Sequence, residues 1–97
     1  MFGIYLTDAA KAQFERLKKD KGLEKRYHAV KKAIHLLSEN PRHKSLQTHE
    51  FTSLIGPKGE KLFEAYAEQS TPAAYRIFWH YGPEKRQITI IAITPHP

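Results

Sequence analysis

The sequence predicts an α+β fold in which a two-helix hairpin packs on a small, mainly antiparallel sheet. Three observations predict it. Apolar residues recur at helical spacing up to about residue 39, polarity alternates residue by residue from about residue 62, and a stretch broken by proline and glycine separates the two parts. The predicted order is β-α-α-β-β-β. The length of 97 residues suits one domain, placed at 1–97.

A short strand and a first helix are expected at the start of the chain. Residues 3–6 form an apolar run with aromatic and β-branched members, which favours a strand. Thr7 and Asp8 then supply capping oxygens and a negative charge for a helix over about 8–20. Gly22 is the expected stop, since glycine commonly follows the last helical turn.

A second helix is predicted over about 24–39. One apolar stripe runs along it at helical spacing, made by Leu23, Tyr27, Val30, Ile34 and Leu37. Basic residues, Arg26 among them, lie off the stripe and are expected to face water. Proline disfavours helical geometry in the residue before it, so Asn40–Pro41 ends the helix.

Residues 41–61 are expected to form a loop-rich connector with room for a short strand around 46–51. Strands are then predicted over 62–68, 73–81 and 87–94, because each segment is alternating or β-branched. Gly82–Pro83 marks the turn between the last two. The final strand is apolar on both faces and is therefore expected in the centre of the sheet.

Composition excludes several classes of function. The sequence contains no cysteine, which excludes disulfides, cysteine-based zinc sites and thiol catalysis. No apolar run reaches the length of a membrane span and the start does not resemble a signal peptide, so we expect a cytoplasmic protein. The histidines show no metal-ligand spacing and no phosphate-binding glycine loop is present, so neither metal nor cofactor is expected.

The net charge of +6 indicates a polyanion or an acidic protein as partner, although a merely solvated basic surface has the same composition. Three lysines of the connector, Lys44, Lys58 and Lys61, are candidates for binding backbone phosphates. The alternative is that they form an ordinary solvated face.

Arg76 is the first candidate for chemistry. It lies within an aromatic strand, on the same face as Phe78 and His80, and a buried guanidinium needs a partner. Its planar fork suits a phosphate, and the neighbouring rings suit base stacking. The alternative is a structural ion pair with Glu64 or Glu68 on the neighbouring strand.

Two histidines end or flank predicted strands. His80 lies on the same face as Arg76 and Phe78, and we count it among the candidate substrate-binding residues. His96 follows the last strand, where an imidazole that titrates near neutral pH suits proton transfer. The alternative for His96 is a frayed chain end.

Taken together, the order of elements and three short motifs resemble the RelE/ParE toxin superfamily. The motifs are Glu39-Asn40-Pro41-Arg42, Tyr75-Arg76-Ile77 and the apolar run from Ile88 to Ile93, which His96 follows shortly afterwards. The resemblance implies a small basic toxin of a type II toxin–antitoxin pair, held inactive by a cognate antitoxin. RelE-like members cut mRNA in the ribosomal A site without a metal ion, and ParE-like members inhibit DNA gyrase.

The resemblance also implies roles for particular residues. Arg76 matches an arginine that stabilises the scissile phosphate, and His96 matches a histidine at the end of the last strand. Glu64 and Tyr66 stand where RelE has two lysines, and the tyrosine that many cleaving members carry after the last strand is missing. Glu64 is then a candidate general base if it faces Arg76. A gyrase inhibitor, or a non-toxic member that acts by binding protein, is the alternative.

Overall fold

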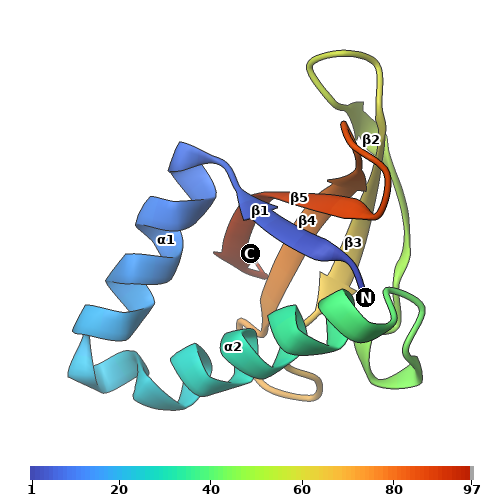
Figure 1. Cartoon of the computed structure of the whole chain (residues 1–97). Helices are drawn as coiled ribbons and strands as arrows, with labels where there is room; N and C mark the ends of the chain where they lie inside the picture. Colours follow the sequence, from blue (N-terminus) through green and yellow to red (C-terminus); the bar gives the residue numbers. More distant parts are fainter. Residues whose placement is uncertain (97) are drawn as a thin grey trace.

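The computed structural model describes residues 1–96, and the sheet formed within this range has five strands (Figure 1). The elements are β1 (Gly3–Leu6), α1 (Asp8–Lys19), α2 (Glu24–Glu39), β2 (His49–Ile55), β3 (Lys61–Tyr66), β4 (Tyr75–Tyr81) and β5 (Gln87–Pro95). The predicted α+β class is confirmed, and so is the order of the predicted helices and strands, to which the structure adds one strand after α2. The strand that the connector had room for is β2, which starts later than expected and is seven residues long.

The strands lie in the order β1-β5-β4-β3-β2. β1 runs parallel to β5, and the other neighbours are antiparallel. β5 has a partner strand on each side, so it is an interior strand of the sheet. The middle position of the sheet belongs to β4 rather than β5, because β2 adds a further strand at the far edge.

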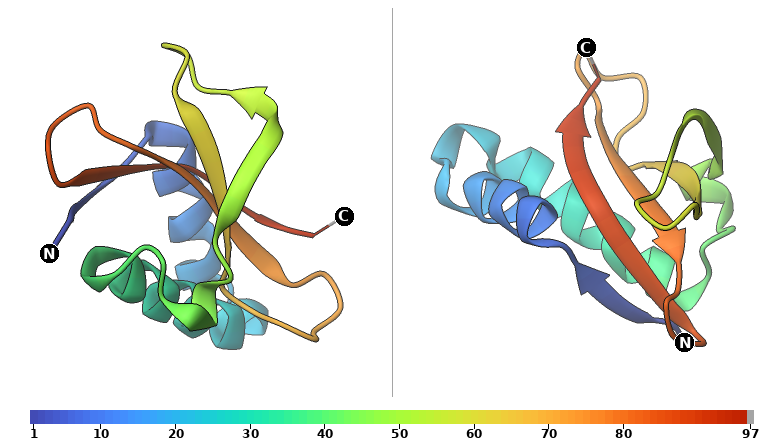
Figure 2. Two further views of the ribbon diagram at one scale, coloured as in Figure 1. Left: turned by 90° about the vertical axis from the view of Figure 1, so that its right-hand side faces the viewer. Right: turned by 90° about the horizontal axis from the view of Figure 1, so that it is seen from above.

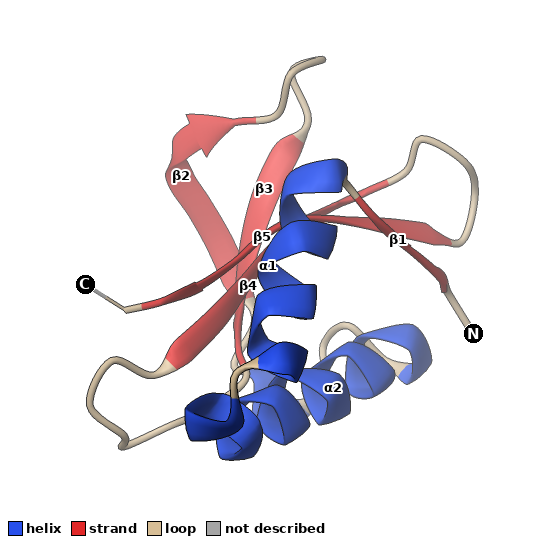
Figure 3. Cartoon of the chain, turned by 90° about the vertical axis from the view of Figure 1, so that its left-hand side faces the viewer, coloured by secondary structure: helices blue, strands red, loops and turns tan. Residues whose placement is uncertain are grey.

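Both helices lie on one side of the sheet (Figures 1 and 3). Thr7 caps α1, where its hydroxyl oxygen accepts a hydrogen bond from the amide of Ala10 at 3.2 Å. α1 ends earlier than Gly22, because the Asp20 carboxylate accepts a hydrogen bond from the Gly22 amide at 2.9 Å and starts a 3-10 turn over 21–23. α2 ends at Glu39, as Asn40–Pro41 predicts.

The core lies between the helices and the sheet. Trp79 is fully buried there, and its ring stacks on Phe63 with the ring centres 4.9 Å apart. Ile77 from the same strand is also fully buried. The helices contribute a set of buried apolar side chains from their inner faces, namely Ala10, Leu17, Val30, Ala33 and Leu37. Alternation along β4 therefore sends Ile77 and Trp79 to the core and Arg76, Phe78 and His80 to the opposite face.

Arg26 corrects the expectation that it faces water. Its guanidinium lies 3.0 Å from the Glu68 carboxylate and donates to the carbonyl oxygens of Ala73 and Pro72 at 2.8 and 3.1 Å. The long side chain thus ties α2 to the loop between β3 and β4. Glu68, one of the two predicted partners of Arg76, is engaged here instead.

Candidate functional site

The sheet face turned away from the helices carries the candidate site, and the left view of Figure 2 looks at the molecule from the side of β2 and β3. The register places Glu64 of β3 opposite Phe78 of β4 and opposite His49 of β2. Arg76 lies opposite Tyr66. Because residues that pair directly share a face, these five side chains project from one side of three neighbouring strands.

Glu64 is the centre of this group. Its side chain is only 4% exposed, yet its carboxylate has two partners. Arg76 Nη1 hydrogen-bonds to Oε2, and His49 Nε2 lies 2.7 Å from Oε1. A buried carboxylate needs such compensation, since an unpaired charge in this environment is strongly disfavoured. The ion pair between Arg76 and Glu64, the structural alternative raised by the sequence, is therefore present.

Arg76 is held in an aromatic setting. The guanidinium carbon lies 5.0 Å from the ring centre of Phe78, which itself meets Phe51 edge-on with the ring centres 4.9 Å apart. Aromatic faces attract the guanidinium and keep water away from the ion pair. Arg76 Nε is buried and has no hydrogen-bond acceptor within residues 1–96. The arginine thus retains a donor that the protein leaves unsatisfied.

His49 is a further member of this group, which the sequence did not single out. Its Nδ1 lies 3.1 Å from the carbonyl oxygen of Gln47, and its Nε2 faces Glu64. Both neighbours are acceptors, so the doubly protonated ring can make both hydrogen bonds and the neutral ring only one. Its side chain is 47% exposed, in contrast to Glu64. His49 therefore offers a proton at the solvent side of a buried carboxylate.

His96 lies one step beyond the ladder between β4 and β5. Its amide donates to the carbonyl oxygen of Ala74 at 2.8 Å, which continues the register in which Arg76 faces Thr94. Strand alternation then places His96 on the same face as Thr94 and Arg76, at the end of the sheet. Its side chain is exposed.

The predicted substrate-binding residues are not gathered at Glu64. His80 lies at the other end of β4, where it lines a hollow together with Lys58. Lys61 is three residues before Glu64 on β3, and residues an odd number of positions apart on a strand lie on opposite faces, so Lys61 belongs to the other face of the sheet. Lys44 lies in the 3-10 turn that follows α2. All three lysines are exposed.

One carboxylate near His80 has a perturbed acidity. The pKa of Glu60 is lowered from its ordinary value of 4.5, chiefly because the backbone amides of Lys58 and of Glu60 itself donate to its carboxylate. The Lys58 amide lies 2.8 Å from Glu60 Oε1. Positive charge on His80 and Lys58 acts in the same direction. Glu60 therefore fixes the loop between β2 and β3 in its ionised form.

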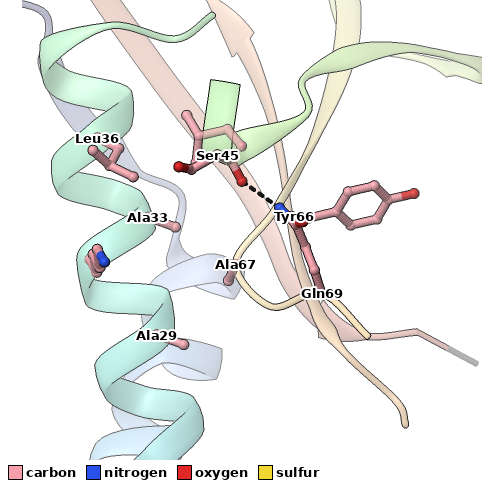
Figure 4. Close-up of a pocket in the computed structure, with 9 residues that line it drawn as sticks. Ala29, Ala33, Leu36, Ser45, Tyr66, Ala67 and Gln69 are labelled. Carbon is pink, nitrogen blue, oxygen red and sulfur yellow. Dashed lines mark hydrogen bonds between the residues drawn. The ribbon is translucent and has the colours of Figure 1, made fainter. Parts of the chain in front are cut away.

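A second hollow, of about 320 Å³, separates α2 from β3 (Figure 4). Its α2 wall includes the small residues Ala29 and Ala33 together with Lys32 and Leu36, and its other wall includes Ala67. The Gln69 amide closes one side by donating to the Ser45 carbonyl oxygen at 2.6 Å. The Tyr66 ring points away from α2 in Figure 4, toward the side of the sheet that carries Glu64.

Two further findings bear on the site. Residues 1–96 contain no group of three histidine or carboxylate side chains arranged to hold a metal ion. No helix in the same range is both long and apolar enough to cross a membrane.

Comparison with known proteins adds similarity of fold. No protein-family model matches the sequence, and no curated protein matches it. Among solved structures, a YoeB/ParE toxin from Agrobacterium tumefaciens has a TM-score of 0.72 at 10% identity, and the match covers 99% of this chain and 100% of that one. A YoeB dimer from Staphylococcus aureus gives 0.71 at 9% identity, over 99% and 98% of the two chains.

A third match is the archaeal RelE–RelB complex from Pyrococcus horikoshii, with a TM-score of 0.65 at 14% identity over 97% of this chain and 93% of that one. Each match spans nearly the full length of both chains, so the likeness concerns the whole arrangement of helices and strands. The chain therefore has the fold of the RelE/ParE-like toxins, as the sequence motifs predict.

Proposed function

We propose that this protein is the toxin of a type II toxin–antitoxin pair and that it cleaves mRNA at the ribosome without a metal ion. The observation that carries the proposal is the group formed by Glu64, Arg76 and His49, in which a carboxylate, a guanidinium and an imidazole meet on the sheet face turned away from the helices. These are the side-chain types that phosphodiester cleavage by internal attack requires.

The proposed reaction uses the 2′-hydroxyl of the RNA as nucleophile. Glu64 Oε1 accepts the hydroxyl proton after His49 moves aside, and the 2′-oxygen forms a bond to phosphorus. The bond from phosphorus to the 5′-oxygen breaks, and a histidine donates a proton to that oxygen. The products are a 2′,3′-cyclic phosphate and a 5′-hydroxyl, so atoms and protons balance.

Arg76 is suited to the charge that develops in this reaction. A phosphorane carries more negative charge on its oxygens than the starting diester, and a preorganised guanidinium stabilises that charge. Arg76 is held in place by Glu64 and Phe78, so it needs no reorganisation when the substrate arrives.

Two histidines compete for the role of the acid. The direct contact with Glu64 favours His49, whereas His96 lies at the end of the sheet on the same face. His49→Gln and His96→Gln separate them, because loss of the acid removes the high-pH limb of the pH–rate profile and loss of a binding group leaves it in place.

The implied partners follow from the same proposal. The ribosome and mRNA supply the polyanion that the charge of +6 favours, and a cognate antitoxin covers the active face. Such a protein acts in the cytoplasm. Lys44, Lys58 and Lys61 then serve as exposed contacts to RNA phosphates, and Lys58 lines the same hollow as His80.

The test is translation in vitro with a defined mRNA and purified protein, followed by mapping of transcript ends. The wild type should cut the mRNA in the presence of EDTA, leaving 5′-hydroxyl ends. Arg76→Lys keeps the positive charge but loses the two parallel N–H donors of the guanidinium. Glu64→Gln keeps the size of the side chain but loses the carboxylate that accepts the proton. Uncut transcripts with wild-type protein would reject the proposal, and relaxed DNA in a parallel gyrase assay would then favour inhibition of gyrase.

A further inference from the structure

A hollow of about 290 Å³ lies on the same sheet face as Glu64 but toward the other end of β4. One row of side chains crosses its floor, because Tyr5 of β1 pairs with Thr89 of β5, and Thr89 pairs with His80 of β4. The loop between β2 and β3 supplies the opposite wall through Lys58 and Glu60. The volume is at the lower end of that found for small-ligand sites.

The floor of the hollow is rigid. The His80 residue is only 5% exposed, and its Nδ1 lies 2.9 Å from the Tyr81 carbonyl oxygen. In the neutral ring that contact places the proton on Nδ1 and makes Nε2 the acceptor. The Thr89 hydroxyl donates to the Gly82 carbonyl oxygen at 2.7 Å. The polar groups of the floor are thus fixed before a ligand arrives.

Tyr5 supplies an unused aromatic surface at the rim. Its side chain belongs to the edge strand β1, the residue is 62% exposed, and no other ring of residues 1–96 packs against it. A large aromatic side chain left open to water beside a hollow is well suited to stack on a planar ligand. The opposite wall carries the Lys58 ammonium group beside the ionised Glu60 carboxylate, so it offers both a donor and an acceptor to the polar edge of that ligand.

The geometry points to a base-binding subsite: we propose that this hollow takes one nucleobase of single-stranded RNA, stacked on Tyr5, from the strand whose phosphate lies at Arg76. The inference rests on the proposed function. Arg76 and His80 are four residues apart on β4, about 13 Å, and Tyr5 lies two strand spacings, about 10 Å, to the side of His80. Arg76 and Tyr5 are therefore about 16 Å apart, which equals roughly five base steps of a stacked strand, so a strand of six nucleotides can reach both places.

The test is an NMR titration of the isotopically labelled full chain with a 2′-O-methyl adenylate hexamer, which has no free 2′-hydroxyl and cannot be cleaved. Amide signals of Tyr5, Gln87 and Thr89 should shift. Tyr5→Leu should weaken binding about tenfold, the effect expected for one lost stacked base. Tyr5→Phe retains the ring and should stay within about twofold of the wild type. A DNA hexamer measures whether the subsite distinguishes the sugar.

Shifts confined to the surroundings of Arg76, equal affinity of Tyr5→Leu and wild type, or no shift at the hollow at millimolar hexamer would each overturn the inference. None of these results decides the proposed function, since transcript cleavage by the wild type and its loss in Arg76→Lys are measured separately. Conversely, hexamer binding at Tyr5 without transcript cleavage would retain the subsite and reject the nuclease.

Discussion

His49 Nε2 lies 2.7 Å from Glu64 Oε1, so the edge strand β2 meets a buried carboxylate that Arg76 of β4 binds from the other side. The contact brings together three residues that are far apart in the sequence. It also places the one half-exposed member of the group where a substrate can reach it.

Replacing His49 with glutamine should reduce transcript cleavage by about 100-fold or more, because a positioned acid contributes that much to proton transfer. The fold should change little, since His49 itself is half-exposed and Glu64 keeps Arg76 as its partner. End mapping measures the rate, and urea unfolding measures the stability. Unchanged cleavage in His49→Gln together with a large loss in His96→Gln would move the role to His96.

The ion pair between Glu64 and Arg76 should show strong thermodynamic coupling. Glu64→Gln and Arg76→Met each leave a partner buried, so each single variant should lose about 3–5 kcal/mol of unfolding free energy. The double variant should lose less than the sum, by about 1–3 kcal/mol. Urea denaturation of all four proteins gives the coupling, and strict additivity would show that the two side chains do not interact.

The ionised carboxylate of Glu60 should make stability depend on pH. Its pKa is lower in the folded chain than its ordinary value of 4.5, so the unfolded chain binds more protons in acid. The ionised Glu60 carboxylate makes its full contribution to the free energy of unfolding above the ordinary pKa. That contribution disappears as the pH falls through the pKa in the folded chain. The unfolding free energies of wild type and Glu60→Gln should therefore converge in acid, once the pH is below the pKa of Glu60 in the folded chain. If the difference in unfolding free energy between wild type and Glu60→Gln grew as the pH fell, the pKa of Glu60 would be raised by folding and not lowered.

Gly56→Ala offers a matched check on Glu60. A methyl group at Gly56 would collide with the Glu60 carboxylate and displace it from the Lys58 amide. The variant should therefore lose the same pH dependence while retaining the glutamate. Persistence of the wild-type profile would mean that the carboxylate keeps its amide partners despite the added methyl group.

The difference in burial between Trp79 and Leu54 predicts a large loss of stability on replacing the first with alanine and almost none on replacing the second. Trp79 is fully buried against Phe63, so Trp79→Ala should cost about 3–5 kcal/mol. Leu54 on β2 is 63% exposed, and Leu54→Ala should change stability by less than about 0.5 kcal/mol. Thermal and urea unfolding measure both, and equal losses would contradict the packing described.

The helices and strands could be predicted from the sequence because each is encoded locally, by helical spacing up to residue 39 and by alternation afterwards. The same alternation placed Arg76, Phe78 and His80 on one face. The contact of His49 with Glu64 could not be predicted, because it depends on the pairing of β2 with β3. That register shifts between Glu50 and Ile55, and no local pattern specifies such a shift.

Long side chains limited the prediction in a different way. Arg26 has the position of a solvated residue on α2, yet its guanidinium reaches the loop after β3. Lys44, Lys58 and Lys61 are close in sequence but lie on separate parts of the fold, since a turn, a loop and a strand face place them independently. Charge in the sequence therefore indicates a polyanion without locating its binding site.

The most direct test of the nuclease proposal compares transcript ends from in vitro translation with wild type, Glu64→Gln and Arg76→Lys, each shown to be folded by circular dichroism. The account predicts 5′-hydroxyl ends within coding sequence for the wild type in EDTA, and at least about 100-fold fewer in both variants. Equal cleavage by all three folded proteins would contradict it, because the carboxylate and the guanidinium would then have no part in the reaction.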